Sequence, residues 1–182
     1  MTGAAFSGAV LSGANTPVSL KSRYQEELRY SIFSKHLQFL DYKGMAEAAA
    51  NLGFDGIDLT VRKGGHVPPE EVEDKLPLAI EAIENAGLRH DMMASDVNNA
   101  EEEIHKRVLK TAAGLGVKLY RLGYVSFSDD QTIPDRLREL NGQMKELAAF
   151  NKSLNISGAY QNHSGTRVGS EIWDIYHLLK DI

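Results

Sequence analysis

Histidine, arginine and amide side chains that could bind a small polar molecule gather in two short runs of the chain. One run extends from Arg62 to His66, and the other extends from Gln161 to Gly165. An imidazole can act as a metal ligand, an acid or base, or a hydrogen-bond donor. A guanidinium can hold a phosphate or carboxylate through its fork of donors. His66 and His163 are therefore candidate catalytic residues, and Arg62 is a candidate substrate-binding residue.

Each of these residues also has a plainer explanation. His163 lies among small residues and could be a surface-loop histidine without a role. Two glycines precede His66 and would let the backbone approach a bound sugar, but they could equally form a plain loop in which His66 covers the end of the fold. Arg62 could form an ion pair with a nearby acid such as Glu70. The sequence leaves both interpretations open.

Other polar residues lie at the ends of predicted strands. Lys35 and His36 end the first strand and are candidate substrate-binding residues, although no distinctive spacing marks them. Arg121 belongs to the fourth strand, and the alternation of side chains points it inward. A buried guanidinium needs a partner, for which Asp58 and Asp91 are candidates. Arg121 is therefore a candidate for substrate binding and for a structural role alike.

Three histidine or tryptophan positions receive no functional role. His105 and the acidic run from Glu101 to Glu103 are expected to form a solvated face of the third helix. His90 lies early in its strand and is expected to be packed. Trp173 belongs to the apolar stripe of the last helix and is expected to lie in the core.

Composition excludes several classes of function. The 182 residues carry a formal charge of -5 with basic and acidic residues intermixed, so no basic face is available for a nucleic-acid partner. The absence of cysteine leaves only His, Asp, Glu or amide oxygens to hold a metal. No nucleophile elbow, Walker loop, dinucleotide fingerprint or HExxH motif occurs, so covalent serine chemistry and nucleotide hydrolysis have no support.

Alternating β-rich runs and helical periods must position the candidate residues. The predicted strands cover residues 29–34, 56–61, 89–95, 118–123 and 156–162, and the predicted helices cover 41–52, 69–86, 100–115, 134–154 and 170–182. The expected helix N-caps are Asp41, Asn99 and Ser170. The first four helices are expected to end at a left-handed residue, namely Gly53, Gly87, Gly116 and Asn155.

Two α/β architectures accommodate this order of elements. The first is a partial (β/α)8 TIM barrel with about five of its eight βα units, and the alternative is an open doubly wound five-stranded parallel sheet. The central strands of a doubly wound sheet are buried on both faces and are therefore continuously apolar. In residues 57–62 the apolar side chains occupy one parity, whereas Asp58, Thr60 and Arg62 occupy the other. This alternation favours the barrel, because one face of each barrel strand meets helices and the other lines the interior.

Three segments resemble the xylose-isomerase-like TIM barrel family, which includes the sugar phosphate isomerases and epimerases. These segments are Gly56-Ile57-Asp58-Leu59-Thr60-Val61-Arg62, Gly64-Gly65-His66-Val67 and Tyr160-Gln161-Asn162-His163-Ser164-Gly165. The resemblance implies a site at the carboxyl ends of the strands, with Asn162 as a further substrate-binding residue. It also implies three more strands.

The same resemblance implies a divalent metal, namely Mn, Mg, Co or Zn, held by histidines and carboxylates. Gln161 occupies the position where many relatives have a metal-binding Glu and is the candidate ligand. A neutral amide donates only a carbonyl oxygen and is a weaker ligand than a carboxylate.

The resemblance implies an isomerase or epimerase that moves a proton next to a carbonyl of a sugar or sugar phosphate. One alternative is a non-catalytic or degenerate barrel fragment that binds carbohydrate. A second is an endonuclease IV-like phosphodiesterase, which the acidic charge opposes. Exposed edges on the first and fifth strands of a five-stranded piece would favour a homodimer.

The two ends of the chain differ from its centre. Residues 1–25 are interpreted as a leader or a disordered tail, because residues 2–20 carry no charge and resemble the latter part of a twin-arginine export signal. A genuine leader would make the protein periplasmic or exported, and otherwise it would be cytoplasmic; no membrane span is expected. Residues 26–182 form the barrel domain, which we expect to be truncated at its C-terminus because the last helix has no cap.

Overall fold

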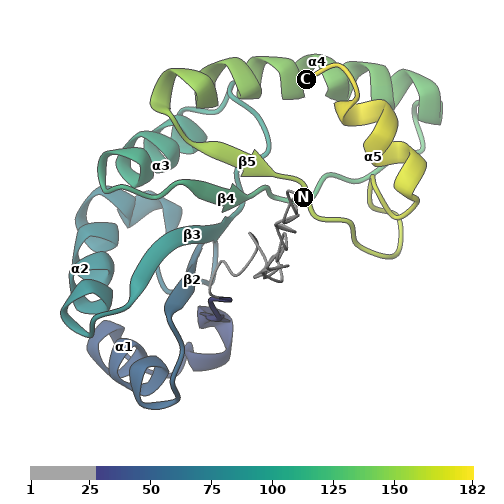
Figure 1. The fold of residues 1–182 in the computed structure, drawn as a ribbon. Helices are drawn as coiled ribbons and strands as arrows, with labels where there is room; N and C mark the ends of the chain where they lie inside the picture. The colour runs from purple at the N-terminus through teal and green to yellow at the C-terminus, as the bar shows by residue number, and fades with distance from the viewer. Residues whose placement is uncertain (1–27) are drawn as a thin grey trace, which may run out of the picture.

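Five parallel strands form one curved sheet in the computed structural model, which describes residues 28–182 (Figure 1). The strands are β1 (Ser31–Phe33), β2 (Gly56–Val61), β3 (Arg89–Ser95), β4 (Leu119–Arg121) and β5 (Ser157–Ala159). The helices are α1 (Tyr42–Asn51), α2 (Val72–Asn85), α3 (Glu103–Gly114), α4 (Ile133–Leu154) and α5 (Ile172–Leu179), with 3-10 helices η1 (Ser34–Leu37) and η2 (Pro69–Glu71). The segment interpreted as a leader lies outside the described residues.

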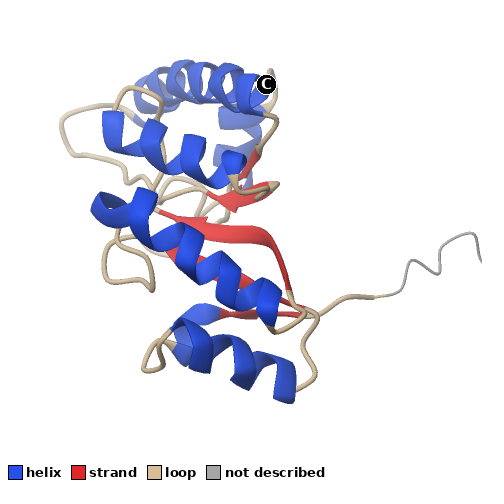
Figure 2. Cartoon of the chain, turned by 90° about the vertical axis from the view of Figure 1, so that its left-hand side faces the viewer, coloured by secondary structure: helices blue, strands red, loops and turns tan. Residues whose placement is uncertain are grey.

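The order of the strands decides between the two predicted architectures. The strands pair in sequence order from β1 to β5, and every pair is parallel. The helices α1 to α4 lie outside the curved row of strands, and a view from their side shows them in front of the sheet (Figures 1 and 2). A doubly wound sheet would reverse its strand order at a switch point and carry helices on both faces. The partial barrel is confirmed, and the doubly wound alternative is wrong.

The alternation of side chains along β2 separates the core from the barrel interior. Ile57, Leu59 and Val61 point toward the helices and are at most 1% exposed. Asp58 and Thr60 occupy the opposite face, as predicted from the sequence. Because paired residues of a parallel sheet share a face, the register carries this inner face across the sheet. Thr60 pairs with Ala94, and Ala94 pairs with Arg121, so Arg121 belongs to the inner face.

The helices end as the sequence predicts. Gly53, Gly87 and Gly116 have φ angles of 82°, 74° and 89°, and Asn155 has a φ of 54°. The three glycines adopt this left-handed conformation without the steric cost of a Cβ atom. The structure therefore confirms all four predicted helix ends.

The predicted helix starts are only partly correct. Asp41 caps α1, because its Oδ1 accepts a hydrogen bond of 2.7 Å from the backbone N–H of Gly44. Asn99 is not an N-cap: its Oδ1 accepts from the backbone N–H groups of Glu101 and Glu102, so it forms a turn just before α3. Ser170 is not an N-cap either, because α5 begins two residues later, after Glu171.

Three strands, β1, β4 and β5, are shorter than predicted. Strand β5 ends at Ala159, so Gln161 and Asn162 lie in the loop that follows it. The backbone N–H of Leu122 still donates to Ala159, but the N–H of Gly123 donates instead to the carbonyl of Val97, which follows β3. The chain after β4 thus leaves β5 and turns toward the loop after β3.

Two expectations about burial are wrong. His105 is only 8% exposed, because its ring lies against the turn before α3, with Nδ1 3.3 Å from Oδ1 of Asn99. Trp173 is 68% exposed, because α5 turns a different side, with Leu178 fully buried, toward the rest of the protein. His90 is packed as expected, and its Nε2 lies 3.0 Å from the carbonyl oxygen of Leu115. No helix within residues 28–182 has the length and apolar character needed to span a membrane.

Candidate functional site

A connected polar cluster lies at the carboxyl ends of β4 and β5. Nη1 of Arg121 donates to the hydroxyl of Tyr124 at 2.9 Å and to Oε1 of Gln161 at 3.1 Å. The Tyr124 hydroxyl in turn donates to the same Gln161 oxygen at 2.8 Å. Three side chains from two neighbouring strand ends thus form a closed hydrogen-bonded triangle. Two of them, Arg121 and Gln161, were predicted from the sequence as site residues.

The ring of Tyr124 holds the cluster together. The guanidinium carbons of Arg121 and Arg167 lie 4.9 and 4.4 Å from its centroid, within the range of cation–π attraction. The ring of His163 meets it edge to face at 5.0 Å. Tyr124 and Arg167 are therefore candidate site residues that the sequence analysis missed.

Gly123 explains how the chain brings Tyr124 back over the strand ends. A Cβ atom at this position would collide with the backbone of Asp96, so only glycine permits the close crossing of the two loops. In the sequence, the Gly123-Tyr124 pair that directly follows Arg121 and Leu122 is the signal from which this turn could have been predicted.

The loops after β4 and β5 support one another and carry Arg167 to the cluster. Ser126 and Arg167 form an antiparallel bridge, and the N–H of Phe127 donates to the carbonyl of Thr166 at 3.1 Å. The hydroxyl of Tyr160 donates to the carbonyl of Val168 at 2.8 Å, and burial raises the pKa of Tyr160 to about 12. The phenol therefore stays protonated and closes the base of the loop that contains His163.

His163 is exposed in this loop and has one ring nitrogen engaged. Its Nδ1 lies 3.0 Å from the carbonyl oxygen of Ser164. Because a carbonyl accepts hydrogen bonds, this contact requires a proton on Nδ1, and the neutral ring then has its lone pair on Nε2. The exposed neighbour Asn162 lies in the same loop.

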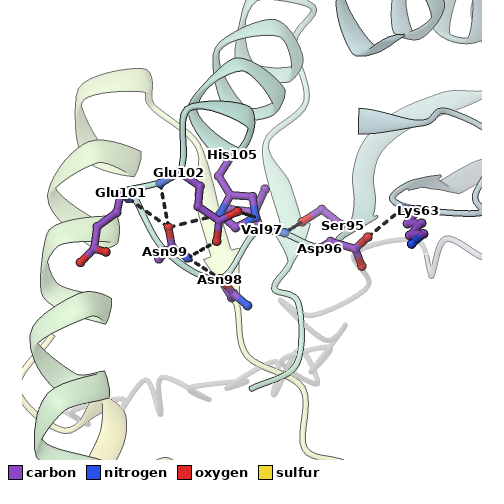
Figure 3. A network of polar contacts seen from close by, with 9 residues as sticks. All are labelled: Lys63, Ser95, Asp96, Val97, Asn98, Asn99, Glu101, Glu102 and His105. Carbon is purple, nitrogen blue, oxygen red and sulfur yellow. Dashed lines mark hydrogen bonds and ion pairs between the residues drawn. The ribbon is translucent and has the colours of Figure 1, made fainter. Parts of the chain in front are cut away.

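Hydrogen bonds fix the strand ends beside the cluster, and Figure 3 shows those at Lys63, Asp96 and the Ser95–Val97 turn. Oγ of Ser95 donates to the carbonyl of Arg121 at 3.0 Å and accepts from the N–H of Val97 at 3.2 Å. Oδ2 of Asp96 accepts from the N–H of Lys63 at 2.7 Å. These bonds join the ends of β2, β3 and β4, and so they position the backbone that carries Arg121.

Asp58 lies on β2, across the inner face from Arg121, and Arg62 directly follows that strand. Burial raises the pKa of Asp58 above its ordinary value, although the charges of Arg121 and Arg62 act in the opposite direction. The predicted ion pair between Arg121 and Asp58 or Asp91 does not form, and Asp91 pairs with Arg89 at 2.6 Å instead.

Arg62 likewise lacks its expected ion pair with Glu70 within the described part of the chain. Its guanidinium carbon instead lies 5.6 Å from the ring centroid of Phe33. That ring also meets His36 edge to face at 6.0 Å. His36 and Lys35 are both exposed on η1.

His66 belongs to a separate, half-buried group between β1 and β2. Its N–H donates to Oγ1 of Thr60 at 3.0 Å, and its Nδ1 lies 3.2 Å from Oγ of Ser34. Nε2 is buried without a hydrogen bond to any described residue. Burial lowers the pKa of His66, and the nearby carbonyls of Leu37 and Leu40 offset only part of this effect. Among residues 28–182, no hydrogen bond links His66 to Gln161 or His163.

The surroundings of Gln161 do not fit a metal ion. Its carbonyl oxygen already accepts two hydrogen bonds, and one of the donors is the permanently charged Arg121. A divalent cation at this oxygen would face the repulsion of that guanidinium. Within residues 28–182, no three His, Asp or Glu side chains are grouped so that they could hold a metal.

Comparisons with known proteins find similarity in structure only. No protein-family model matches the chain, and no curated protein sequence matches it significantly. A putative xylose isomerase from Rhodospirillum rubrum superposes with a TM-score of 0.67 at 17% identity, and D-allulose 3-epimerase from Methylomonas sp. superposes with 0.64 at 12% identity. The IolI protein, solved with a bound zinc atom, superposes with 0.62 at 14% identity.

Each of these matches covers 85% of this chain but only 59–61% of the other protein. The chain thus spans about 60% of the length of the solved structures that it matches. Together with the sequential parallel strand order, these matches show that the chain has the fold of the xylose-isomerase-like TIM barrels, of which it contains five consecutive βα units.

Proposed function

We propose that the cluster at the ends of β4 and β5 binds a sugar or sugar phosphate, and that the protein isomerises or epimerises it by proton transfer next to a carbonyl. The observation that carries this proposal is the triangle of Arg121, Tyr124 and Gln161. It holds the charged guanidinium of Arg121 in place at the edge of the barrel where enzymes of this architecture bind their substrates. The similar solved structures include proteins described as an epimerase and a putative xylose isomerase.

The guanidinium of Arg121, which Tyr124 and Gln161 hold in place, would polarise the substrate carbonyl. Removal of the neighbouring proton places negative charge on the carbonyl oxygen, and donors that are already oriented stabilise this charge without reorganisation. A guanidinium remains charged throughout the accessible pH range. Arg121 would therefore supply the positive charge that a metal supplies elsewhere, and no step of this proposal uses a metal at Gln161.

Two groups would transfer the proton. His163 has its Nε2 lone pair available when Nδ1 is bound to the carbonyl of Ser164. Asp58 lies on the inner face with a raised pKa, which brings the carboxyl closer to the working pH of a general acid or base. Asn162, Arg62, Lys35 and His36 would contact substrate hydroxyls or charges around them. His66, the other candidate catalytic residue, would contribute from the half-buried group between β1 and β2.

Hydrogen exchange with solvent tests the proposed reaction. The protein is incubated with D-fructose or D-fructose 6-phosphate in D2O, and deuterium at the carbons next to the carbonyl is followed by NMR. We expect incorporation to fall by roughly 100-fold or more in Arg121→Gln and His163→Gln, which is the usual size of an acid–base or charge-stabilising contribution. His177→Gln, which changes an exposed histidine of α5, is the matched control and should retain the rate.

The non-catalytic alternative predicts a different result in the same samples. A carbohydrate-binding fragment would bind the sugar, with chemical-shift changes around Gln161 and His163, but would leave every carbon-bound hydrogen in place. Binding without deuterium incorporation would therefore reject the isomerase proposal and retain the carbohydrate site.

A further inference from the structure

We propose that the site binds its sugar derivative through an anionic group, a carboxylate or a phosphate, held by Arg121 and Arg167. This inference rests on the proposed function, because it names the class of ligand for the same site. It goes beyond that function because a neutral ketose would satisfy the reaction equally well.

The distribution of ion pairs among the arginines supports an anionic ligand. Residues 28–182 contain eight arginines. Those with an acidic partner are Arg89, Arg107, Arg136 and Arg138. Those without an ion pair to a described residue are Arg29, Arg62, Arg121 and Arg167. Three of these four lie at the carboxyl ends of β2 and β4 or in the loop after β5. By contrast, every arginine on a described helix forms an ion pair.

Two of these guanidiniums, those of Arg121 and Arg167, contact the same aromatic ring. Arg121 and Arg167 both lie within 5 Å of the Tyr124 ring centroid. Arg62 and Arg121 both act on the carboxyl of Asp58. Like charges held together without a counter-ion repel one another, and this cost disappears when an anion binds.

Arg121 and Arg167 both have hydrogen-bond donors without a partner among the described residues. Nη1 of Arg121 donates hydrogen bonds to Tyr124 and Gln161, while its Nε is buried without a partner among the described residues. The guanidinium of Arg167 donates no hydrogen bond to any residue of the described chain. A buried donor without a partner is costly, and a carboxylate or phosphate accepts from a guanidinium fork in bidentate fashion.

The acidic groups nearby do not neutralise this charge. Asp58 is the acid on the inner face, and burial disfavours its charged form. Asp174, on α5, is engaged by the N–H of Gly169 at 3.2 Å and forms no ion pair with Arg167. The cluster therefore has a surplus of positive charge, although the whole chain carries -5.

Calorimetric titration of the full chain tests this inference. The probes are D-fructose, D-fructose 6-phosphate, D-glucuronate and inorganic phosphate, each measured at 50 mM and 300 mM NaCl. We expect at least one anionic sugar to bind about tenfold or more tightly than D-fructose, with an affinity that falls as salt rises. A preference for D-fructose 6-phosphate identifies a phosphate as the anionic group, and a preference for D-glucuronate identifies a carboxylate.

Variants locate the bound anion. Arg167→Gln and Arg121→Gln should each lower the affinity for the anionic sugar about tenfold. Arg138→Gln, on the exposed face of α4, should leave this affinity unchanged. Equal affinities for D-fructose and the anionic sugars would overturn the inference but retain the proposed function. Failure of every anion to bind, or an equal loss in Arg138→Gln, would also overturn it. Deuterium incorporation into neutral D-fructose tests the proposed function independently.

Discussion

Nη1 of Arg121 lies 3.1 Å from Oε1 of Gln161, so a guanidinium on β4 is joined to an amide in the loop after β5. The permanent charge of Arg121 thus stands beside the oxygen that resemblance to metal-dependent barrels would assign to a cation. Electrostatics at this pair disfavours a metal ion at the Gln161 oxygen.

Gln161→Glu should strengthen this contact without creating a metal site. The new carboxylate would form an ion pair with Arg121, and because position 161 is exposed we expect a gain of only about 0.5 kcal/mol in the free energy of unfolding. Urea denaturation with and without Mn2+ measures both effects. Gln143→Glu on α4 is the control for the added charge. Stabilisation of Gln161→Glu by micromolar Mn2+ would contradict our account of this pair.

Asp58→Asn should stabilise the protein at neutral pH. Burial raises the folded-state pKa of Asp58 above its unfolded value, so the folded state binds more protons between these two values. Stability linked to this group is therefore lost as pH rises through that interval, and the cost persists at pH 7. Thermal unfolding should show a higher midpoint for Asp58→Asn at pH 7 and a smaller difference near pH 3.5.

Asp129→Asn, in the exposed loop before α4, is the control for removing one negative charge. An equal gain in both variants would attribute the effect to overall charge. A lower midpoint for Asp58→Asn at pH 7 would mean that the attraction of Arg62 and Arg121 outweighs burial.

His66 should make stability fall in mild acid. Burial holds its folded-state pKa below the ordinary value of 6.5, so the unfolded state binds more protons in the interval between the two. The stability linked to His66 is present above pH 6.5 and is lost progressively as pH falls below it. Urea denaturation at a series of pH values from 5 to 7.5 measures this effect. The free energy of unfolding should depend less steeply on pH in His66→Gln than in the wild type, whereas His177→Gln should keep the wild-type dependence.

Thr60→Val should be clearly destabilising although it preserves shape. Thr60 is fully buried, and its Oγ1 accepts from the N–H of His66 and contacts Oγ of Ser34 at 3.0 Å. The methyl group would leave two polar groups without this partner, so we expect a loss of roughly 1–3 kcal/mol. Denaturation of Thr166→Val, in an exposed loop, provides the comparison. A loss below about 0.5 kcal/mol would show that the hydroxyl network adds little.

Predictions from the sequence succeeded where a repeating pattern recorded the environment of a residue. The alternation from Ile57 to Arg62 reflects a strand with helices on one side, and it correctly predicted the barrel and the inward position of Arg121. Gly87 and Asn155 were recognisable because a left-handed helix end favours these two residue types.

Predictions failed where a contact depends on loops that have no period. Tyr124 and Arg167 lie 43 residues apart in the sequence, and only the crossing at Gly123 and the bridge from Ser126 to Arg167 bring them together. Trp173 lies in an apolar stripe that is wider than the side of α5 that is buried, so periodicity alone assigned it to the core. Gln161 was predicted to lie in a strand, but β5 ends at Ala159 because the chain after β4 turns away from it. Composition gives no sign of that turn.

Backbone amide shifts during titration with D-fructose and with its 6-phosphate test the location of the sugar site most directly. We predict saturable shifts for Gly123, Tyr124 and the loop from Gln161 to Gly165, which lose saturation in Arg121→Gln but not in Arg138→Gln. Shifts confined to the groove between α4 and α5, where Ile133 and Lys180 lie, or no shifts with either sugar, would contradict a sugar site at the ends of β4 and β5.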